Sequence, residues 1–327
     1  MTFLLHGATL TLACFLIVNL AASIAVAGIA TRPPRIASPV FWFALRLLPA
    51  AVATSFAVIV FVPSYWRYEP RESVEGFAVT LTACALGALA IVASGAARGV
   101  SAWWRARRRT MLWMRTSHRA DLRVAGAASS TLPPAFIVDA DQAVMALVGV
   151  LRPRLLVTRG LIDALTEDEL AASVAHELGH SRAWDNLKRL LMRAAPDLLA
   201  PTAAARAIER RWASAAEHAA DRMCGHADAA ARCALASALV KVARLTPPEP
   251  LVAEPISTLV GGGEIASRVR LLLDDDRAAS PDRRRRRLRW IGVAAIAATA
   301  AASLAVAYAP LLHTVHEATE VVVHSLP

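Results

Sequence analysis

The pentapeptide His176-Glu177-Leu178-Gly179-His180 combines residue types and a spacing that suit metal-assisted hydrolysis. On an α-helix, side chains four residues apart lie on one face, so His176 and His180 can bind the same metal ion. Glu177 then lies beside the open coordination position, where a carboxylate can accept a proton from water. The motif therefore predicts a zinc site that activates water, with Glu177 as the general base.

A predicted helix over residues 166–195 carries the motif. Thr166 and Glu169 form a capping-box pattern at its start, and Pro196 follows its end. In its first half the apolar residues lie on one arc, while the two motif histidines point to roughly the opposite side. We expect this helix to pack through its apolar arc and to expose the histidines to a cleft.

The segments around this helix predict a compact α+β domain. Three short apolar runs with turn residues between them predict strands at 135–138, 143–150 and 155–158. Helices are expected after the motif, from just after Thr202 to Gly225, over about 228–245 and over 264–273. A small sheet therefore precedes the motif helix, and further helices follow it.

The rest of the chain is apolar enough to enter a membrane. Of 327 residues, 56% are hydrophobic, and four apolar stretches reach the roughly 20 residues that cross a bilayer. They are about 8–30, 40–62, 74–97 and 290–310. Arg46 and Pro49 in the second are interpreted as a snorkelling and a kinking residue, with a polar contact inside a helix bundle as the alternative.

Arginine accumulates on one side of these predicted spans. One cluster follows the third span, and residues 283–287 with Arg289 precede the fourth. Because basic residues favour the cytoplasmic side, the segment between these spans is expected inside and both termini outside. Arg67 and Arg71, in a loop expected outside, run mildly against this orientation.

The net charge of +10 does not by itself predict nucleic-acid binding. Its arginines lie near span ends, where they orient helices and contact anionic lipid, and no nucleic-acid recognition motif accompanies them. The four cysteines show no paired metal-binding spacing, so reduced structural thiols are expected. We expect a lipid bilayer and a protein or peptide substrate as partners, and no nucleic acid.

The residues alone leave the third metal ligand open. Five candidates lie within one short region: Glu217, His218, Asp221, His226 and Asp228. Each type can bind zinc, and spacing does not separate them.

The stretch VTRGLIDALTEDELAASVAHELGHSRAWDNL, with EHAAD further on, resembles the membrane-bound gluzincin peptidases. The likeness is strongest to the BlaR/MecR-type receptor proteases and more distant to the HtpX-type membrane proteases. The resemblance implies that Glu217 is the third zinc ligand and that Asp221 orients a ligand histidine. His218 and His226 are then interpreted as polar helix and cap residues.

The resemblance also implies an architecture. It is a multi-pass α-helical membrane protein with an α+β zincin-like (gluzincin) metalloprotease domain, residues 98–276, between the third and fourth transmembrane helices. A basic juxtamembrane segment, 277–289, and a short external tail, 311–327, complete it. The β-lactam receptors carry a large external sensor domain after the fourth span, so antibiotic sensing is not implied here.

The implied activity is zinc-dependent peptide hydrolysis at the cytoplasmic face of a bacterial inner membrane. An oxyanion donor is expected, with Arg268 or His226 as candidates. The strand 143–150 either pairs with an extended substrate, as in resembling enzymes, or is an ordinary sheet strand.

The substrate is a cytoplasmic repressor, in regulated proteolysis, or a membrane protein, in quality control. Two rivals remain: a non-catalytic membrane signalling or scaffold protein with structural zinc, and a soluble protease whose apolar helices pack internally.

Overall fold

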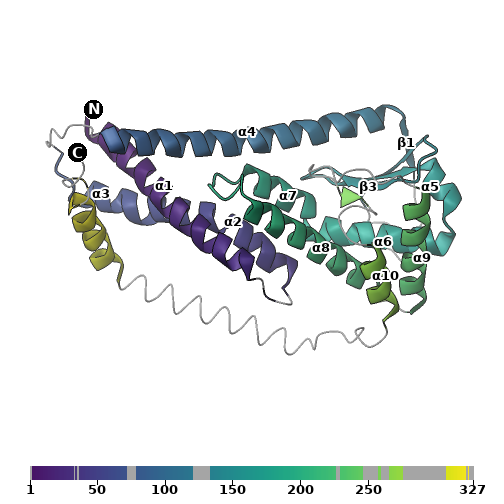
Figure 1. Cartoon of the computed structure of the whole chain (residues 1–327). Helices are drawn as coiled ribbons and strands as arrows, with labels where there is room; N and C mark the ends of the chain where they lie inside the picture. The colour runs from purple at the N-terminus through teal and green to yellow at the C-terminus, as the bar shows by residue number, and fades with distance from the viewer. Residues whose placement is uncertain are drawn as a thin grey trace.

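The computed structural model describes residues 2–32, 34, 37–71, 79–120, 133–225, 229–245, 257–258, 265–274, 307–321 and 323. Figure 1 shows long helices at one end of the molecule and a mixed domain of helices and a small sheet at the other. The two parts meet in the middle, and α4 runs along both.

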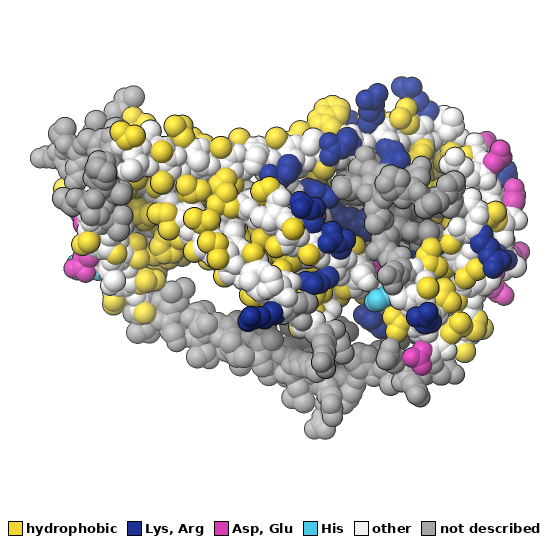
Figure 2. Space-filling model, in the orientation of Figure 1, with side chains coloured by type: hydrophobic (Ala, Val, Ile, Leu, Met, Phe, Trp, Pro, Cys, Tyr) yellow, Lys and Arg dark blue, Asp and Glu magenta, His cyan; other side chains and the backbone are white. Residues whose placement is uncertain are grey.

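Within the described residues, three helical segments are long and apolar enough to cross a membrane. They are Phe3–Thr31 in α1 (Thr2–Thr31), Pro39–Tyr68, and α4 (Val79–Arg115). The second comprises α2 (Pro39–Ser55), the π-helical η1 (Phe56–Phe61) and α3 (Val62–Tyr68). Apolar side chains cover much of the visible surface of this bundle (Figure 2), as expected where lipid replaces water.

The third apolar helix is much longer than the predicted span 74–97, because α4 continues to Arg115. Its second half lies against the domain, where Ala106 is buried with the sheet residues Ala146, Val148 and Leu156. The buried positions in this half of α4 include the small residues Gly99, Ala102 and Ala106. Of the predicted fourth span, residues 290–306 lie outside the described part, and 307–310 begin a helix that continues to 321.

The sheet has the strand order β1-β2-β4-β3-β5. The strands are β1 (Ser117–Ala120), β2 (Ala135–Val138), β3 (Met145–Val148), β4 (Arg154–Thr158) and β5 (Ser257–Thr258). Among the described strands, β2 and β4 pair in parallel and the other neighbours pair antiparallel. The three predicted strands are present as β2, β3 and β4. The strand that could pair with an extended substrate is β3, and its edge away from β4 is paired with β5 at Ala146 and Leu147.

Six helices complete the part of the domain that the structure describes. They are α5 (Arg159–Ala164), α6 (Glu167–Ala183), α7 (Asp185–Ala194), α8 (Ala203–Gly225), α9 (Ala229–Leu245) and α10 (Ile265–Leu273). The main core lies between α6, α9, α10 and the sheet, and includes Met145, Val157, Val174, Leu235 and Leu239. The predicted helices after the motif are confirmed, whereas α5 was not predicted.

The motif helix is not the single helix predicted over 166–195. Its start is confirmed, since Thr166 and Glu169 form the reciprocal capping box. The helix ends at Ala183, and Trp184 adopts a left-handed conformation with φ of 57° before α7 begins. This conformation is uncommon for a bulky residue and turns the chain sharply. The motif helix and α7 are therefore separate elements.

The helix bundle and the domain share a buried junction. Val26 of α1 and Trp42 of α2 pack with Leu199, Ile208 and Trp212 of the domain. On the other side, a Cβ atom on Gly95 would lie 2.8 Å from the Ala194 carbonyl oxygen, so α4 needs glycine for this close approach. The bundle is therefore packed directly against the elements that follow the motif.

Arg46 takes part in this junction, so its interpretation as a snorkelling residue was wrong. Its side chain is buried, with Nη1 2.8 Å from Asp197 Oδ2 and Nε 3.0 Å from Glu209 Oε1. Nη2 donates to the Met192 carbonyl oxygen at 3.1 Å. A charged group inside a packed interface needs such partners, because unpaired burial is costly. The alternative, a polar contact within the packed helices, is the one the structure shows.

Candidate metal centre

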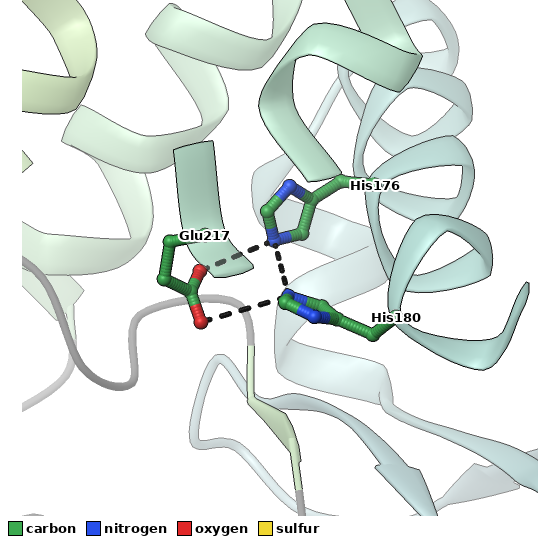
Figure 3. Close-up of side chains that lie close together, drawn as sticks. All are labelled: His176, His180 and Glu217. Carbon is green, nitrogen blue, oxygen red and sulfur yellow. Dashed lines mark hydrogen bonds and ion pairs between the residues drawn. The ribbon is translucent and has the colours of Figure 1, made fainter. Parts of the chain in front are cut away.

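Two histidines and one glutamate converge in the interior of the domain (Figure 3). His176 and His180 come from α6 and Glu217 from α8, and all three are fully buried. The two Nε2 atoms lie 3.2 Å apart, and the Glu217 carboxylate oxygens lie 3.4 and 3.5 Å from them. Ligand atoms 2.0 to 2.1 Å from a tetrahedral zinc ion lie about 3.4 Å apart. The donor types and their spacing therefore fit zinc.

Gly179 allows α8 to approach close enough to supply Glu217. A Cβ atom at this position would lie 3.1 Å from Ala220 Cα and 3.2 Å from its Cβ. Because Ala220 is three residues after Glu217, this contact lies about one helical turn from the carboxylate. The small residue inside the motif therefore sets the distance between the helices that carry the three groups.

An aspartate carboxylate lies beside the other ring nitrogen of each histidine. Asp221 Oδ1 lies 2.9 Å from His176 Nδ1, and Asp185 Oδ2 lies 2.7 Å from His180 Nδ1. These contacts leave both Nε2 atoms directed at the shared centre, as in metal sites where a carboxylate orients the ligand imidazole. The Asp221 carboxylate thus lies beside the Nδ1 atom of His176, and the Asp185 carboxylate beside that of His180.

Asp185 was missed by the sequence reasoning. In one continuous helix, a residue five positions after His180 would lie about 140° around the axis from it. The left-handed Trp184 redirects the chain at this point and lets Asp185 face back to His180. An aspartate in the first turn of α7 is an ordinary helix-start residue, so local pattern alone would not single it out.

Glu177 lies in the same enclosed region and is 1% exposed. Neither of its carboxylate oxygens has a hydrogen-bond partner among the described residues. Burial raises the pKa of this carboxyl, while the nearby His180 and His176 act to lower it. Burying a carboxylate without hydrogen-bond partners costs free energy, so a purely structural role would not favour it. A perturbed pKa is typical of a group that exchanges protons.

Arg268 of α10 closes another side of the centre and is 1% exposed. Its Nε and Nη2 atoms donate to both oxygens of Asp221, at 2.9 and 2.7 Å. Its Nη1 atom lies 3.1 Å from Glu217 Oε2. Arg268 therefore holds the two carboxylates that bind and orient the donor set, and its Nη2 atom also lies 3.4 Å from His176 Nε2. The other suggested oxyanion donor, His226, lies outside the described residues.

The charges of this cluster favour a bound cation. Burial lowers the pKa of both histidines, but Glu217 and the partner aspartates outweigh it, raising the pKa of His176 and bringing that of His180 to about 10. For Glu217, burial acts to raise the pKa, yet the charge of His180 and contacts with both histidines lower it. Without a metal, protons on the imidazoles balance the carboxylates. A divalent cation can replace those protons, because metal binding and proton release are coupled.

The other candidates for a third ligand do not join this group in the described structure. His218 also lies on α8 but is not among the converging residues, and burial lowers its pKa. Asp228, like His226, lies outside the described residues. Among the candidates that are described, Glu217 is the one that reaches both histidines.

A cavity of about 240 Å³ adjoins the centre. It is lined by His180, Trp184 and Asn186 on the helix side and by Leu147 and Gly149 on the sheet side. Asn186 Nδ2 donates to the carbonyl oxygens of Leu147 and Gly149, at 2.9 and 3.1 Å, and so ties α7 to the end of β3. A small cavity thus connects the end of the motif helix with the strand nearest to it.

Comparison with known families agrees with this chemistry. Residues 112–246 match the model of peptidase family M48, a segment that contains His176, Glu177, His180 and Glu217 and ends before Arg268. No curated protein matches the chain. The match supports a metallopeptidase, and the three apolar helices and small mixed sheet fit a membrane-anchored one. It does not distinguish the BlaR/MecR type from the HtpX type. The central segment of this chain is thus similar to the metallopeptidases of family M48.

Proposed function

We propose that this protein is a membrane-anchored zinc endopeptidase whose metal centre is formed by His176, His180 and Glu217. The convergence of these three buried donors beside the unpaired carboxylate of Glu177 carries the proposal. The match to peptidase family M48 supports the same reaction class. Three protein ligands with one open position are typical of catalytic zinc, whereas structural zinc is usually closed by four.

In the proposed mechanism, the chain supplies orientation and proton transfer. Bound zinc would lower the pKa of water and polarise the scissile carbonyl. Glu177 accepts the proton of the attacking water and passes it to the leaving amine. Asp221 and Asp185 hold the ligand histidines in one tautomer, and Arg268 balances the charge of Glu217 and Asp221.

The proposed location of the active site is the cytoplasmic face of a bacterial inner membrane. Figure 2 shows Lys and Arg side chains in a band between the apolar bundle surface and the domain. In the second half of α4, the Arg107 guanidinium lies over the rings of Trp103 and Trp104, at 5.2 and 5.8 Å from their centres. Basic and indole side chains at such a boundary suit an interface with anionic lipid.

The substrate is proposed to be a protein that reaches this surface, either a cytoplasmic repressor or a membrane protein. A close packing of bundle and domain, through Arg46 and Gly95, supports a centre kept near the lipid surface. Substrates trapped by Glu177→Gln in cells and identified by mass spectrometry would separate regulated proteolysis from quality control. Enrichment of no protein would contradict both.

The test of catalysis compares purified wild type with Glu177→Gln and with the control Glu167→Gln, an exposed glutamate on the same helix. We expect one zinc ion in each catalytic site of all three proteins, but cleavage of a peptide library to fall about 10²- to 10⁴-fold only in Glu177→Gln. Removal of zinc by a chelator should abolish cleavage, and added zinc should restore it.

The non-catalytic rival makes different predictions for the same samples. If zinc is structural, the Glu177 variant and wild type will cleave equally, or neither will cleave while both retain zinc. The soluble-protease rival is tested by washing membranes with carbonate. Release of the full chain without detergent would overturn membrane anchoring.

A further inference from the structure

A second group of metal-binding residue types lies at the opposite end of the molecule from the metal centre. Ligand atoms of Glu69, His316 and Glu320 lie within 4.8 Å of one another. Glu69 is the residue that follows α3, while His316 and Glu320 lie four residues apart on the helix 307–321. Figure 1 shows this helix, drawn in yellow, beside α3 at the end of the bundle far from the sheet. Two segments far apart in sequence thus supply one donor set.

The C-terminal helix is held in place by contacts other than these donors. The Ser64 hydroxyl donates to the Leu312 carbonyl oxygen at 2.6 Å, and the Tyr308 hydroxyl donates to that of Ile59 at the same distance. The ring of Tyr68 stacks on His316, with 5.7 Å between centres and an interplanar angle of 25°. The position of His316 is therefore set by packing, which gives a metal site a fixed imidazole.

The donors are partly enclosed and leave room for an ion. The side chain of Glu69 is 5% exposed and that of His316 is 19% exposed. His316 Nδ1 lies 3.8 Å from Glu69 Oε2, which is longer than a hydrogen bond. This distance between the nitrogen and oxygen atoms is close to the separation of two ligand atoms that bind the same metal ion. Helical spacing puts Glu320 on the same face as His316, so the three groups can surround one position.

We propose that Glu69, His316 and Glu320 form a second divalent-metal site, which ties the C-terminal helix to the end of α3. One imidazole with two carboxylates suits a transition-metal ion such as Zn²⁺, because Mg²⁺ and Ca²⁺ prefer oxygen ligands alone. The site lies across the bundle from the catalytic centre. In the proposed membrane orientation it binds an ion on the external face, while peptide hydrolysis takes place on the cytoplasmic face.

Zinc binding by the full-length protein in detergent tests the site. To separate it from the catalytic centre, binding is measured at buffered free zinc in His180→Ala, which removes one catalytic ligand. This variant should retain about one zinc per chain if the distal site binds as a unit with three protein ligands. Adding His316→Phe, which keeps an aromatic ring against Tyr68, or Glu69→Gln should abolish that remaining zinc.

The matched controls are His313→Phe and Glu317→Gln on the same helix. His313 also contacts the Tyr68 ring, and both control side chains are more than half exposed. In the His180→Ala background they should leave zinc binding unchanged. Loss of all zinc from His180→Ala alone, or equal loss with His313→Phe and His316→Phe, would overturn the proposal.

Hydrogen exchange gives a second readout that does not depend on stoichiometry. Zinc should slow amide exchange in residues 307–321 in wild type and in His180→Ala, because the ion links this helix to α3. His316→Phe should exchange at the rate seen in wild type without metal. Exchange that is insensitive to zinc in wild type would contradict a metal link, even if catalytic zinc is present.

Discussion

The metal centre and the junction at Arg46 are both buried polar clusters, but they balance charge in different ways. At the junction, the guanidinium of Arg46 faces Asp197 and Glu209 and also binds a backbone carbonyl. At the centre, His176, His180 and Glu217 converge on one point, and Arg268 lies beside them with its Nη1 atom 3.1 Å from Glu217 Oε2. The ion pairs of Arg46 leave the junction complete as folded, whereas the two imidazoles beside Glu217 can exchange their protons for a divalent cation.

The two clusters also differ in the elements that they join. Arg46 lies where α2 packs on the domain, so its ion pairs join the apolar bundle to Asp197, which follows α7, and to Glu209 of α8. The metal donors lie on α6 and α8, which meet closely at Gly179. The ion pairs of the first cluster hold the bundle and the domain together. The charged groups of the second cluster can bind a metal ion and exchange protons.

The largest expected effect is on the junction. Arg46→Met keeps an unbranched side chain but leaves Asp197 buried without its cation, so unfolding in detergent should become easier by about 3–5 kcal/mol. Zinc content of the protein that remains folded should not change. Arg206→Met, at an exposed arginine on α8, is the control. A loss of zinc in the folded fraction, with unchanged thermal stability, would contradict the division of roles.

A smaller effect is expected from the residue that orients His180. Asp185→Ala removes the partner of His180 Nδ1 but leaves all three donors in place, so zinc affinity should fall about 10- to 100-fold. Competition with a chelator measures this change, and Asp163→Ala, an exposed aspartate on α5, is the control. An unchanged affinity would mean that packing alone orients the imidazole.

The smallest effect concerns a carboxylate that is paired at the surface of the domain core. Burial acts to raise the pKa of Glu169, but Lys241, Ser237 and the Thr166 amide stabilise its charge and lower the pKa to about 2. Its stabilisation should therefore be complete above about pH 5 and decline as the pH falls from about 4.5 towards 2. Since Lys241 is partly exposed, we expect about 1–2 kcal/mol.

Unfolding free energies measured between pH 6 and 3 in wild type and Glu169→Gln check this prediction. The glutamine variant should lose that part of the pH dependence, and Glu167→Gln should retain it. If Glu169→Gln has the same pH profile as wild type, the pairing with Lys241 contributes no proton-linked stability.

Much of the domain could be predicted because its signals are local. The capping box at Thr166 and Glu169 depends on residues three positions apart, and the motif histidines share a helical face in any helix. The strands β2, β3 and β4 follow from short apolar runs between turns. Glu217 could not be chosen by spacing alone, because several polar residues lie on or next to the same helix, and family resemblance was needed to prefer it.

By itself, the sequence determined the apolar spans, the motif, its helix start and the donor types, because these depend on composition and on contacts within a few residues. Tertiary structure decided what those residues contact. The left-handed Trp184 brings Asp185 to His180, and α10 places Arg268 on Asp221. Local pattern alone would place Arg46 at the membrane surface, but packing of α2 against the domain buries it and pairs it with Asp197. Burial and charge pairing between distant segments arise only when the chain is folded, so no local pattern contains them.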